Sequence, residues 1–144
     1  MTAKELNTSS RLISVASRLL AARLQEDFST NEIDITVEQW RILFYLWEED
    51  GINQNELAKR ADKEKSTMTR QIEALEKKDL IFRESHSSDK RNKLIYLTRK
   101  GKKLEKQAMG IADSITVLSE KGITKKDMEV FKKVMIQVIT NIKD

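Results

Sequence analysis

The order of apolar and polar residues over residues 54–101 constrains the fold of this chain more than any other feature. Apolar residues recur at helical spacing in two short segments, 54–61 and 64–78, which a polar turn separates. Two short runs of β-forming residues follow, 80–82 and 94–97, on either side of a polar turn. This succession predicts a helix-turn-helix followed directly by a two-stranded hairpin, a wing.

Amphipathic helices are predicted on both sides of this central segment. Apolar residues recur at helical spacing over residues 9–28, from Thr36 to about residue 50, over 99–119 and from Thr124 to the end. Thr36 and Gln39 have the spacing of a capping box, which marks the start of a helix. Proline is absent and glycine occurs four times, so few positions force a break. The predicted fold class is mainly α-helical with a small β-hairpin wing.

Positive charge is concentrated in the central segment. Residues 54–106 carry 16 Lys and Arg against 9 Asp and Glu, a net charge of +7, whereas the rest of the chain has a net charge of −3. The formal net charge of the whole chain is +4, so a basic module is attached to a slightly acidic frame. Basic charge confined to one folded module indicates a surface that binds a polyanion.

The composition argues against several kinds of site. The chain has no cysteine and a single histidine, His86, which excludes disulfides, thiolate nucleophiles and most histidine metal sites. No histidine–carboxylate pair or glycine-rich phosphate loop is present, so we expect no enzyme, no cofactor and no metal site. The apolar runs are far shorter than the roughly 20 residues that span a bilayer, and no apolar leader follows Met1. We therefore expect a cytoplasmic protein without membrane contact.

The order of these elements, together with five short sequences, resembles the multiple-antibiotic-resistance regulator (MarR) family of winged-helix transcription regulators. The five sequences are Leu57-Ala58-Lys59-Arg60, Lys65-Ser66-Thr67-Met68-Thr69-Arg70, Leu75-Glu76-Lys77-Lys78-Asp79-Leu80-Ile81, Asp89-Lys90-Arg91 and Leu97-Thr98-Arg99-Lys100-Gly101. The resemblance implies a winged helix-turn-helix with N- and C-terminal dimerisation helices. It divides the chain into a dimerisation helix (1–35), a DNA-binding domain (36–101) and C-terminal dimerisation helices (102–144).

Three residues at turns depart from the family pattern. Asp62 and Asp79 stand where the family favours glycine. Aspartate tolerates the left-handed backbone conformation better than most residues, so we expect both turns to form at a modest cost. Lys63 occupies a position that is usually apolar, which leaves open how this turn packs.

The helix predicted over 64–78 has an outward face suited to DNA. Short hydroxyl side chains let the backbone approach the bases, and an arginine can make bidentate contacts with guanine in the major groove. An ordinary solvated face is the alternative. Against it, Lys63 and Lys65 lie at a helix N-terminus, where the macrodipole disfavours each cation by about 0.3–1 kcal/mol. The predicted DNA-binding residues of this helix are Lys65, Ser66, Thr67, Thr69 and Arg70.

The predicted wing carries a second basic group, formed by Lys90, Arg91 and Lys93. A narrow, A·T-rich minor groove concentrates negative potential and attracts an inserted arginine. The resemblance implies that Arg91 inserts and that Asp89 positions the wing. The alternative is that these charges only prevent aggregation of an edge hairpin. Further cations at residues 99–103 either reach the phosphate backbone or only aid solubility, and are left outside the predicted site.

The two terminal helices carry apolar stripes that need a partner. In the last helix the apolar residues repeat at alternating spacings of three and four. We expect this stripe to pack with the matching stripe of the first helix across a homodimer interface. Packing within one chain is the alternative. The predicted interface residues are Leu12, Ala16, Leu19, Met128, Phe131, Met135, Val138 and Ile142.

These expectations combine into a homodimeric transcription regulator that binds double-stranded DNA at a pseudo-palindromic operator. Each recognition helix would enter a major groove and each wing a flanking minor groove. The resemblance further implies a ligand-responsive repressor whose small aromatic or amphipathic effector binds between the dimer and DNA lobes. No residue identifies that effector, although Trp40 and Trp47 are expected in the core near such a cavity. The alternative is a winged-helix protein-interaction module without base readout, which would give no gel shift on random duplex DNA at low salt.

Overall fold

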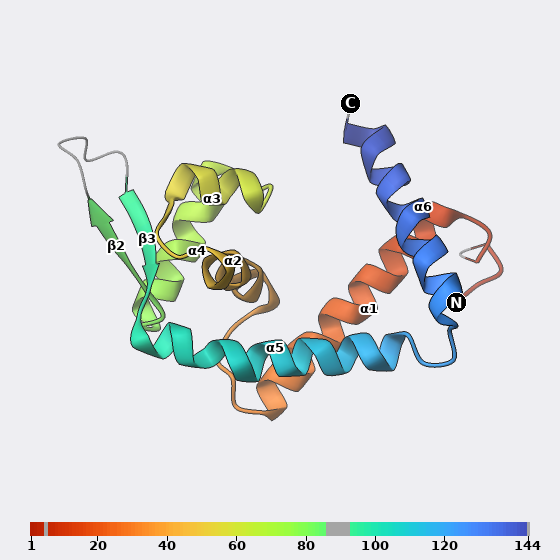
Figure 1. The fold of residues 1–144 in the computed structure, drawn as a ribbon, viewed down its shortest axis with the longest axis horizontal. Coiled ribbons are helices and arrows are strands. Elements are labelled where there is room, and N and C mark those ends of the chain that lie inside the picture. Colours follow the sequence, from red (N-terminus) through yellow and green to blue (C-terminus); the bar gives the residue numbers. More distant parts are fainter. Residues whose placement is uncertain (5, 86–92, 144) are drawn as a thin grey trace. The chain divides into compact units, whose positions relative to one another are not determined.

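The chain folds into two compact units, residues 1–112 and 113–144. The computed structural model describes residues 1–4, 6–85 and 93–143 (Figure 1). In chain order the elements are α1 (Ser9–Thr30), α2 (Val37–Glu48), β1 (Ile52–Asn53), α3 (Gln54–Arg60), α4 (Lys65–Lys77), β2 (Ile81–Ser85), β3 (Lys93–Leu97), α5 (Arg99–Ser119) and α6 (Lys125–Lys143). Helix α5 runs through the boundary between the units. The predicted fold class, mainly helical with a small hairpin, is confirmed.

A small antiparallel sheet joins the wing to the helices of the first unit. Its strand order is β1-β3-β2, and β2 and β3 form the predicted hairpin, with Ile81 opposite Leu97. The sequence does not predict the third strand, β1, in which Ile52 pairs with Ile95 of β3. The expected two-stranded element is therefore corrected to a three-stranded sheet. Because β1 comes directly before α3, this pairing fixes the base of the wing to the helix-turn-helix.

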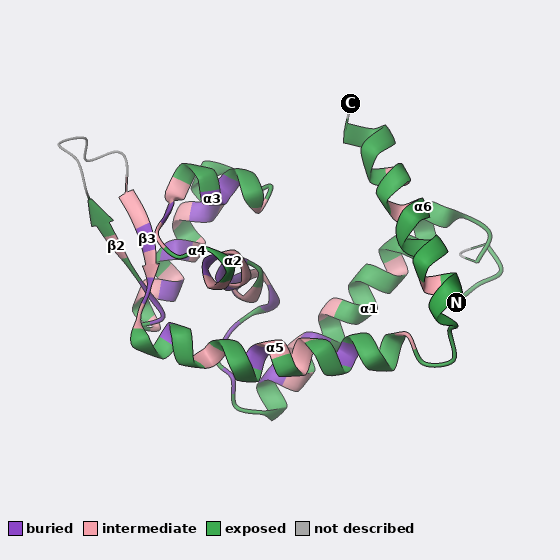
Figure 2. Cartoon of the chain, viewed as in Figure 1, coloured by how far each residue is buried: buried purple, intermediate pink, exposed green. Residues whose placement is uncertain are grey.

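The core of the first unit lies where α2, α3 and α4 pack against the sheet, and Figure 2 shows buried residues on each of these elements. Helix α1 contributes its C-terminal end, since Phe28 is fully buried and its ring centroid lies 6.4 Å from that of Trp40. The largest fully buried side chains are Phe28, Leu43, Leu46, Leu57, Met68, Ile72, Leu75 and Ile95. Burial of one such side chain contributes about 1.5–3 kcal/mol. The helix-turn-helix is thus held by a core that it shares with α1 and the sheet.

The predicted cap of α2 and the two aspartate turns are present. Thr36 Oγ1 accepts a hydrogen bond from the Gln39 backbone N–H at 3.1 Å, and Gln39 Oε1 accepts one from the Thr36 backbone N–H at 3.1 Å. Asp62 and Asp79 have φ angles of 52° and 58°. The expectation that aspartate would adopt the left-handed conformation at both turns is therefore confirmed.

A glycine in the first turn of α5 allows this helix to approach the chain that follows α4. A Cβ atom at Gly101 would lie 2.1 Å from the carbonyl oxygen of Leu80. Next to it, Thr98 Oγ1 donates to the Asp79 carbonyl at 2.6 Å and accepts from the Gly101 N–H at 3.0 Å. Trp47 Nε1 donates to the Gly101 carbonyl at 3.0 Å. These contacts fix the start of α5 against both α2 and α4.

The second unit consists of the end of α5, a turn and α6. Helix α6 has no buried residue. Its exposed large apolar side chains are Val130, Phe131, Val134, Ile136, Ile139 and Ile142. Contiguous apolar surface of this kind marks a site of interaction. No helix in the described part of the chain is long and apolar enough to cross a membrane.

Candidate nucleic-acid interface

The N-terminal half of α4 brings the five predicted recognition residues together on the surface of the first unit. Lys65, Ser66 and Arg70 are exposed, and Thr67 and Thr69 are half-buried. The opposite face of the helix is buried through Met68, Ile72 and Leu75. The core therefore sets which face of α4 is turned outward.

The first turn of α4 is open to an anion. Its N-cap residue, Glu64, makes no side-chain hydrogen bond to the turn, and the turn itself contains no acidic residue. A helix N-terminus carries partial positive charge and amide groups that point outward, so it favours a negatively charged group. With the Lys65 ammonium group on the same turn, this end of α4 suits a phosphate.

Hydroxyl groups of the predicted site already have partners within the chain. Thr69 Oγ1 donates to the Lys65 carbonyl at 2.9 Å and accepts from Gln54 Nε2 at 3.2 Å. Thr69 therefore holds the start of α3 against α4, a role that the sequence does not predict. Arg70 Nη2 lies 3.4 Å from Thr67 Oγ1, a long contact that an incoming acceptor can replace.

A hollow of about 610 Å³ lies between α3 and the start of α4. The residues that line it are Asn55, Ala58, Lys59, Asp62, Lys63, Glu64 and Lys65. Asn55 and Lys59 are exposed and lie one helical turn apart on α3, yet they are absent from the predicted site. Their four-residue spacing beside the recognition helix is the signal that could have identified them. They extend the basic surface from α4 onto α3.

Only part of the predicted wing site lies within the described residues. Lys93 begins β3 opposite Ser85 and is half-buried. The other predicted wing residues, Asp89, Lys90 and Arg91, lie outside the described residues, as does His86. Their proposed contacts with DNA therefore remain predictions.

An ion pair connects the wing to the recognition helix. Arg83 Nη2 on β2 lies 2.7 Å from Glu76 Oε1 on α4, and both side chains are largely shielded from water. On the outer side of the same sheet, the rings of Phe82 and Tyr96 stack with their centroids 5.4 Å apart. The hairpin and α4 are thus held as one structure. Side chains of the recognition helix and side chains of the wing can therefore reach the same ligand.

A second ion pair closes the turn between α3 and α4. Lys63 Nζ lies 2.8 Å from Glu38 Oε2, and Arg41 Nη1 lies 2.9 Å from Glu38 Oε1. The hydrogen bond from Lys63, together with the positive charges of Lys63 and Arg41, lowers the pKa of Glu38 below its ordinary value of 4.5, against the opposing effect of partial burial. The open question of how Lys63 packs is answered by this contact with α2.

Helix α2 carries a small aromatic hollow of about 130 Å³. The residues that line it are Glu38, Trp40, Arg41, Ile42, Phe44, Tyr45, Ala61 and Lys63. The indole N–H of Trp40 is buried and has no hydrogen-bond partner among the described residues. Buried donors are nearly always paired, so this N–H, on a residue that lines the hollow, lacks the acceptor that such groups usually have. Trp40 thus lines a hollow, whereas Trp47 does not. Only α2 and the turn between α3 and α4 form this hollow, so the expected cavity between the dimer and DNA lobes stays a prediction.

The predicted dimer residues form apolar stripes on α1 and on α6. On α1, Leu12 and Leu19 are 39% and 55% exposed, and Ala16 is exposed. On α6, Phe131 and Ile142 are 54% and 77% exposed, and Met128, Met135 and Val138 are half-buried. Side chains this apolar and this exposed in a single chain are suited to a protein interface.

The geometry of the first unit agrees with three comparisons. The sequence profile of the MarR family matches residues 35–93. The transcriptional regulator HosA of Escherichia coli O127:H6 (strain E2348/69 / EPEC) is 26% identical over 102 residues, which cover 71% of this chain and 76% of HosA. In the crystal structure of the S. aureus MepR–DNA complex, the MepR chain matches with a TM-score of 0.86 and 28% identity, over 93% of this chain and 98% of that one.

A MarR-family transcriptional regulator from Listeria monocytogenes, solved with a 26mer DNA, matches with a TM-score of 0.84 and 26% identity, over 94% of this chain and 89% of that one. Such relatives regulate transcription and are not enzymes, in agreement with the prediction from the sequence. Both solved structures match the fold of this chain over more than nine-tenths of its length. The chain is therefore similar to the MarR family of transcriptional regulators, in sequence over residues 35–93 and in fold over nearly its whole length.

Proposed function

We propose that the chain acts as a homodimer that represses transcription from a pseudo-palindromic operator and leaves DNA when a small ligand binds. The start of α4 carries this proposal, because exposed Lys65, Ser66 and Arg70 surround a helix N-terminus without a side-chain cap. Similar chains solved in complex with DNA support the use of this surface.

In the proposed complex, α4 enters a major groove with its N-terminus leading. Arg70 donates two hydrogen bonds to guanine O6 and N7, and Ser66 is short enough to let the helix approach the base edges. Lys65 neutralises a phosphate. Arg91 of the wing enters the flanking minor groove, where A·T-rich sequence narrows the groove and strengthens its negative potential.

The homodimer supplies the two reading heads that a pseudo-palindrome requires. The apolar stripes of α1 and α6 are covered by the partner subunit, so residues 1–35 and 102–144 act as the dimerisation regions around a DNA-binding domain of residues 36–101. Two recognition helices then contact half-sites about 34–36 Å apart, one turn of the duplex. The cytoplasm, where the protein meets the DNA, is the proposed location.

The aromatic hollow beside Trp40 is the proposed effector site. Its volume of about 130 Å³ is close to that of engineered cavities of about 150 Å³ that bind benzene, so it suits a single aromatic ring. In the proposed complex an acid group on that ring accepts a hydrogen bond from the Trp40 N–H and competes with Glu38, which also lines the hollow, for Arg41 and Lys63. The effector weakens DNA binding only if it favours a dimer with wrongly spaced reading heads, and by linkage DNA then weakens effector binding equally.

Operator selection followed by a salt titration tests the proposed function. Genomic fragments that the protein retains would first be sequenced, and the best site would be titrated by fluorescence anisotropy at several salt concentrations. If the dimer neutralises about 6–10 phosphates, the log–log slope of affinity against salt is roughly −5 to −9. A slope near zero on every duplex would exclude DNA binding, and a winged helix that serves only protein interaction would give that result.

A further inference from the structure

A hollow of about 520 Å³ lies at the other end of the recognition helix. It is bounded by the chain between α1 and α2, the end of α4 and the first turns of α5. The residues that line it are Glu32, Ile33, Asp34, Ile35, Lys77, Lys78, Leu80, Lys100, Lys103, Leu104 and Gln107. Its volume is within the range of about 300–1,000 Å³ that small-molecule sites occupy. We refer to it as the lysine hollow.

Four lysines and two acidic residues, Glu32 and Asp34, line the lysine hollow, so its lining has a positive balance. The end of α4 accounts for Lys77 and Lys78, because cations stabilise a helix C-terminus. It does not account for Lys100 and Lys103 near the start of α5, where the macrodipole disfavours cations. The first turn of α5 contains no acidic residue, and the nearby Asp50 pairs with Lys102, at 3.9 Å. A bound anion would relieve this repulsion.

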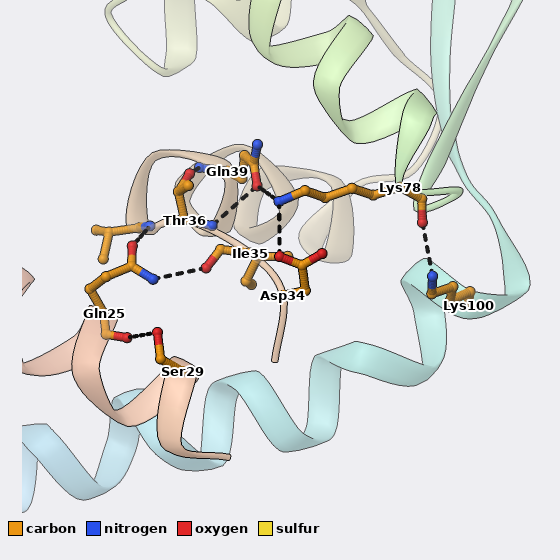
Figure 3. Close-up of polar contacts among 9 residues, drawn as sticks. Gln25, Ser29, Asp34, Ile35, Thr36, Gln39, Lys78 and Lys100 are labelled. Carbon is orange, nitrogen blue, oxygen red and sulfur yellow. Dashed lines mark hydrogen bonds and ion pairs between the residues drawn. The ribbon is translucent and has the colours of Figure 1, made fainter. Parts of the chain in front are cut away.

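The ammonium groups differ in how far they are already paired. Lys78 Nζ donates to Gln39 Oε1 at 2.8 Å and lies 3.6 Å from Asp34 Oδ1 (Figure 3). Lys100 Nζ donates to the Lys78 carbonyl at 3.0 Å. Within the described residues, no hydrogen bond or ion pair holds Lys77 or Lys103. Two of the four cations are thus available to a ligand without breaking a contact.

The lysine hollow is separate from the DNA-contacting end of α4. Twelve residues separate Lys65 from Lys77, so at 1.5 Å per residue the two ends of the helix are about 18 Å apart. A duplex that receives the N-terminus of α4 in its major groove therefore contacts this helix at the end away from the lysine hollow. Lys100 and Lys103 belong to the cations for which a contact with the phosphate backbone was left open, but Lys77 and Lys78 do not, so DNA alone does not explain the positive balance of the hollow.

We propose that the lysine hollow binds a small polyanion, a molecule with two or more phosphate or carboxylate groups, and that its occupation weakens DNA binding. The second part rests on the proposed function. An anion between Lys77 and Lys103 also attracts the Lys78 ammonium group. Without the anion this group donates a hydrogen bond to Gln39, which completes the capping box of α2.

The same contacts link the recognition helix to α1. Gln25 on α1 donates to the Ile35 carbonyl at 3.1 Å and accepts from the Val37 N–H at 3.1 Å (Figure 3). The chain between α1 and α2, which lines the lysine hollow, is thus hydrogen-bonded to α1 through Gln25. Through Gln39 it is also linked to Lys78 at the end of α4. Loss of the Lys78 contact frees α4 to move relative to the proposed dimerisation helix.

Calorimetric titration of the full-length protein tests the binding step. The probes are pyrophosphate and tricarballylate, with acetate as a monovalent comparison, in magnesium-free buffer at fixed ionic strength. The parent should bind at least one polyanion and not acetate, and Lys77→Gln combined with Lys103→Gln should weaken binding at least tenfold. Lys102→Gln combined with Lys106→Gln removes the same charge from α5 outside the lining and should change binding less than twofold. Equal losses in both double variants, or no polyanion binding by the parent, would overturn the proposal.

An operator titration in parallel separates this proposal from the proposed function. A saturating polyanion should lower the operator affinity of the parent at least threefold and should leave that of the Lys77→Gln, Lys103→Gln variant unchanged. If the parent binds the polyanion and its operator affinity does not change, the proposed coupling is wrong. If the parent binds no operator even without a polyanion, the proposed function fails instead. The four substituted lysines are exposed, and circular dichroism verifies that each variant is folded.

Discussion

Lys63 in the turn between α3 and α4 reaches Glu38 in the first turn of α2, with 2.8 Å between Nζ and Oε2. A cation thus occupies a position that is usually apolar in this family, and it is accommodated by an acidic partner on the neighbouring helix. The ammonium group lowers the pKa of Glu38 because it stabilises the ionised carboxylate. This contact contributes to the angle between α2 and the helix-turn-helix.

Replacement of Lys63 should destabilise the fold in a pH-dependent way. The pKa of Glu38 in the folded protein lies below 4.5, so the pair stabilises the fold above the unfolded-state pKa and ceases to do so as the pH falls through the folded-state value. Because the Glu38 side chain is 42% exposed, we expect Lys63→Gln to lower the free energy of unfolding at pH 7 by only about 0.2–1 kcal/mol. Urea unfolding at pH 7 and pH 3 measures this loss, which should be smaller at the lower pH.

The matched control for that experiment is Lys59→Gln, which removes an exposed positive charge from α3 and should change stability little at either pH. The pKa of Glu38 can also be followed directly by nuclear magnetic resonance. It should rise in Lys63→Gln, because the hydrogen bond from Lys63 is the largest of the effects that lower it. An unchanged Glu38 pKa would show that Lys63 does not act on this carboxylate.

Two glycines of α5 should respond to alanine in opposite directions. A Cβ at Gly101 would stand 2.1 Å from a backbone oxygen that cannot rotate away, so Gly101→Ala should destabilise the fold by about 1–3 kcal/mol. At Gly110 no atom lies within 4 Å of the added Cβ, and Gly110→Ala should stabilise the helix by about 0.5–1 kcal/mol. Thermal unfolding compares the two variants with the parent. Shifts of the same sign would contradict the packing of α5 against the chain that follows α4.

Features that depend on a few neighbouring residues could be predicted from the sequence. The capping box of Thr36 and Gln39 is local, so residue type and spacing were enough to predict it. The left-handed turn at Asp62 is local too, but it was expected from the resemblance to the family, in which a glycine is usual there. Strand β1 could not be predicted because it is two residues long and exists only through its pairing with β3, far along the chain. A run this short carries no periodicity from which a strand can be identified.

The candidate site likewise contains features that the sequence predicts from neighbouring residues and features that depend on tertiary packing. The exposure of Lys65, Ser66 and Arg70 follows from helical periodicity, since the opposite face of α4 is apolar and buried. The contact of Thr69 with Gln54 and the unpaired N–H of Trp40 depend on how separate helices pack. No spacing rule within one helix predicts them, because the distances are set by the tertiary core.

Substitution of the two arginines should separate base readout in the two grooves. Arg70→Ala should cost about 1–3 kcal/mol at the selected operator and should relax the preference at one base pair. Arg91→Ala should weaken mainly sites with A·T-rich flanks, since minor-groove width controls that contact. Anisotropy titrations on paired operators measure both effects, with Lys121→Ala in the exposed turn between α5 and α6 as the control. If both arginine variants bind the operator as tightly as the parent, the assignment of the site is wrong.

A charge on the apolar stripe of α6 should dissociate the proposed homodimer. The side chain of Phe131 is 54% exposed in the single chain, and a carboxylate buried there in an apolar interface would cost several kcal/mol. We expect Phe131→Glu to be monomeric and to bind the operator much more weakly. Light scattering measures the mass, and Lys132→Glu, one residue along the same helix, is the control that should remain dimeric. An unaltered mass for Phe131→Glu would move the interface away from this stripe.

The tryptophans should report effector binding selectively. A salicylate-like aromatic acid in the hollow would lie against Trp40, so millimolar concentrations should quench emission and reduce operator affinity. Trp47→Phe keeps Trp40 as the only tryptophan and should retain the quenching, whereas Trp40→Phe should lose it, because Trp47 donates to Gly101 and does not line the hollow.

Peroxide at a comparable dose should leave operator binding intact, since the chain has no cysteine and its methionines oxidise without the selectivity of a reactive thiol. Release from DNA by peroxide, reversed by a thiol reductant, would contradict this mechanism, and quenching that persists in Trp40→Phe would place the effector elsewhere.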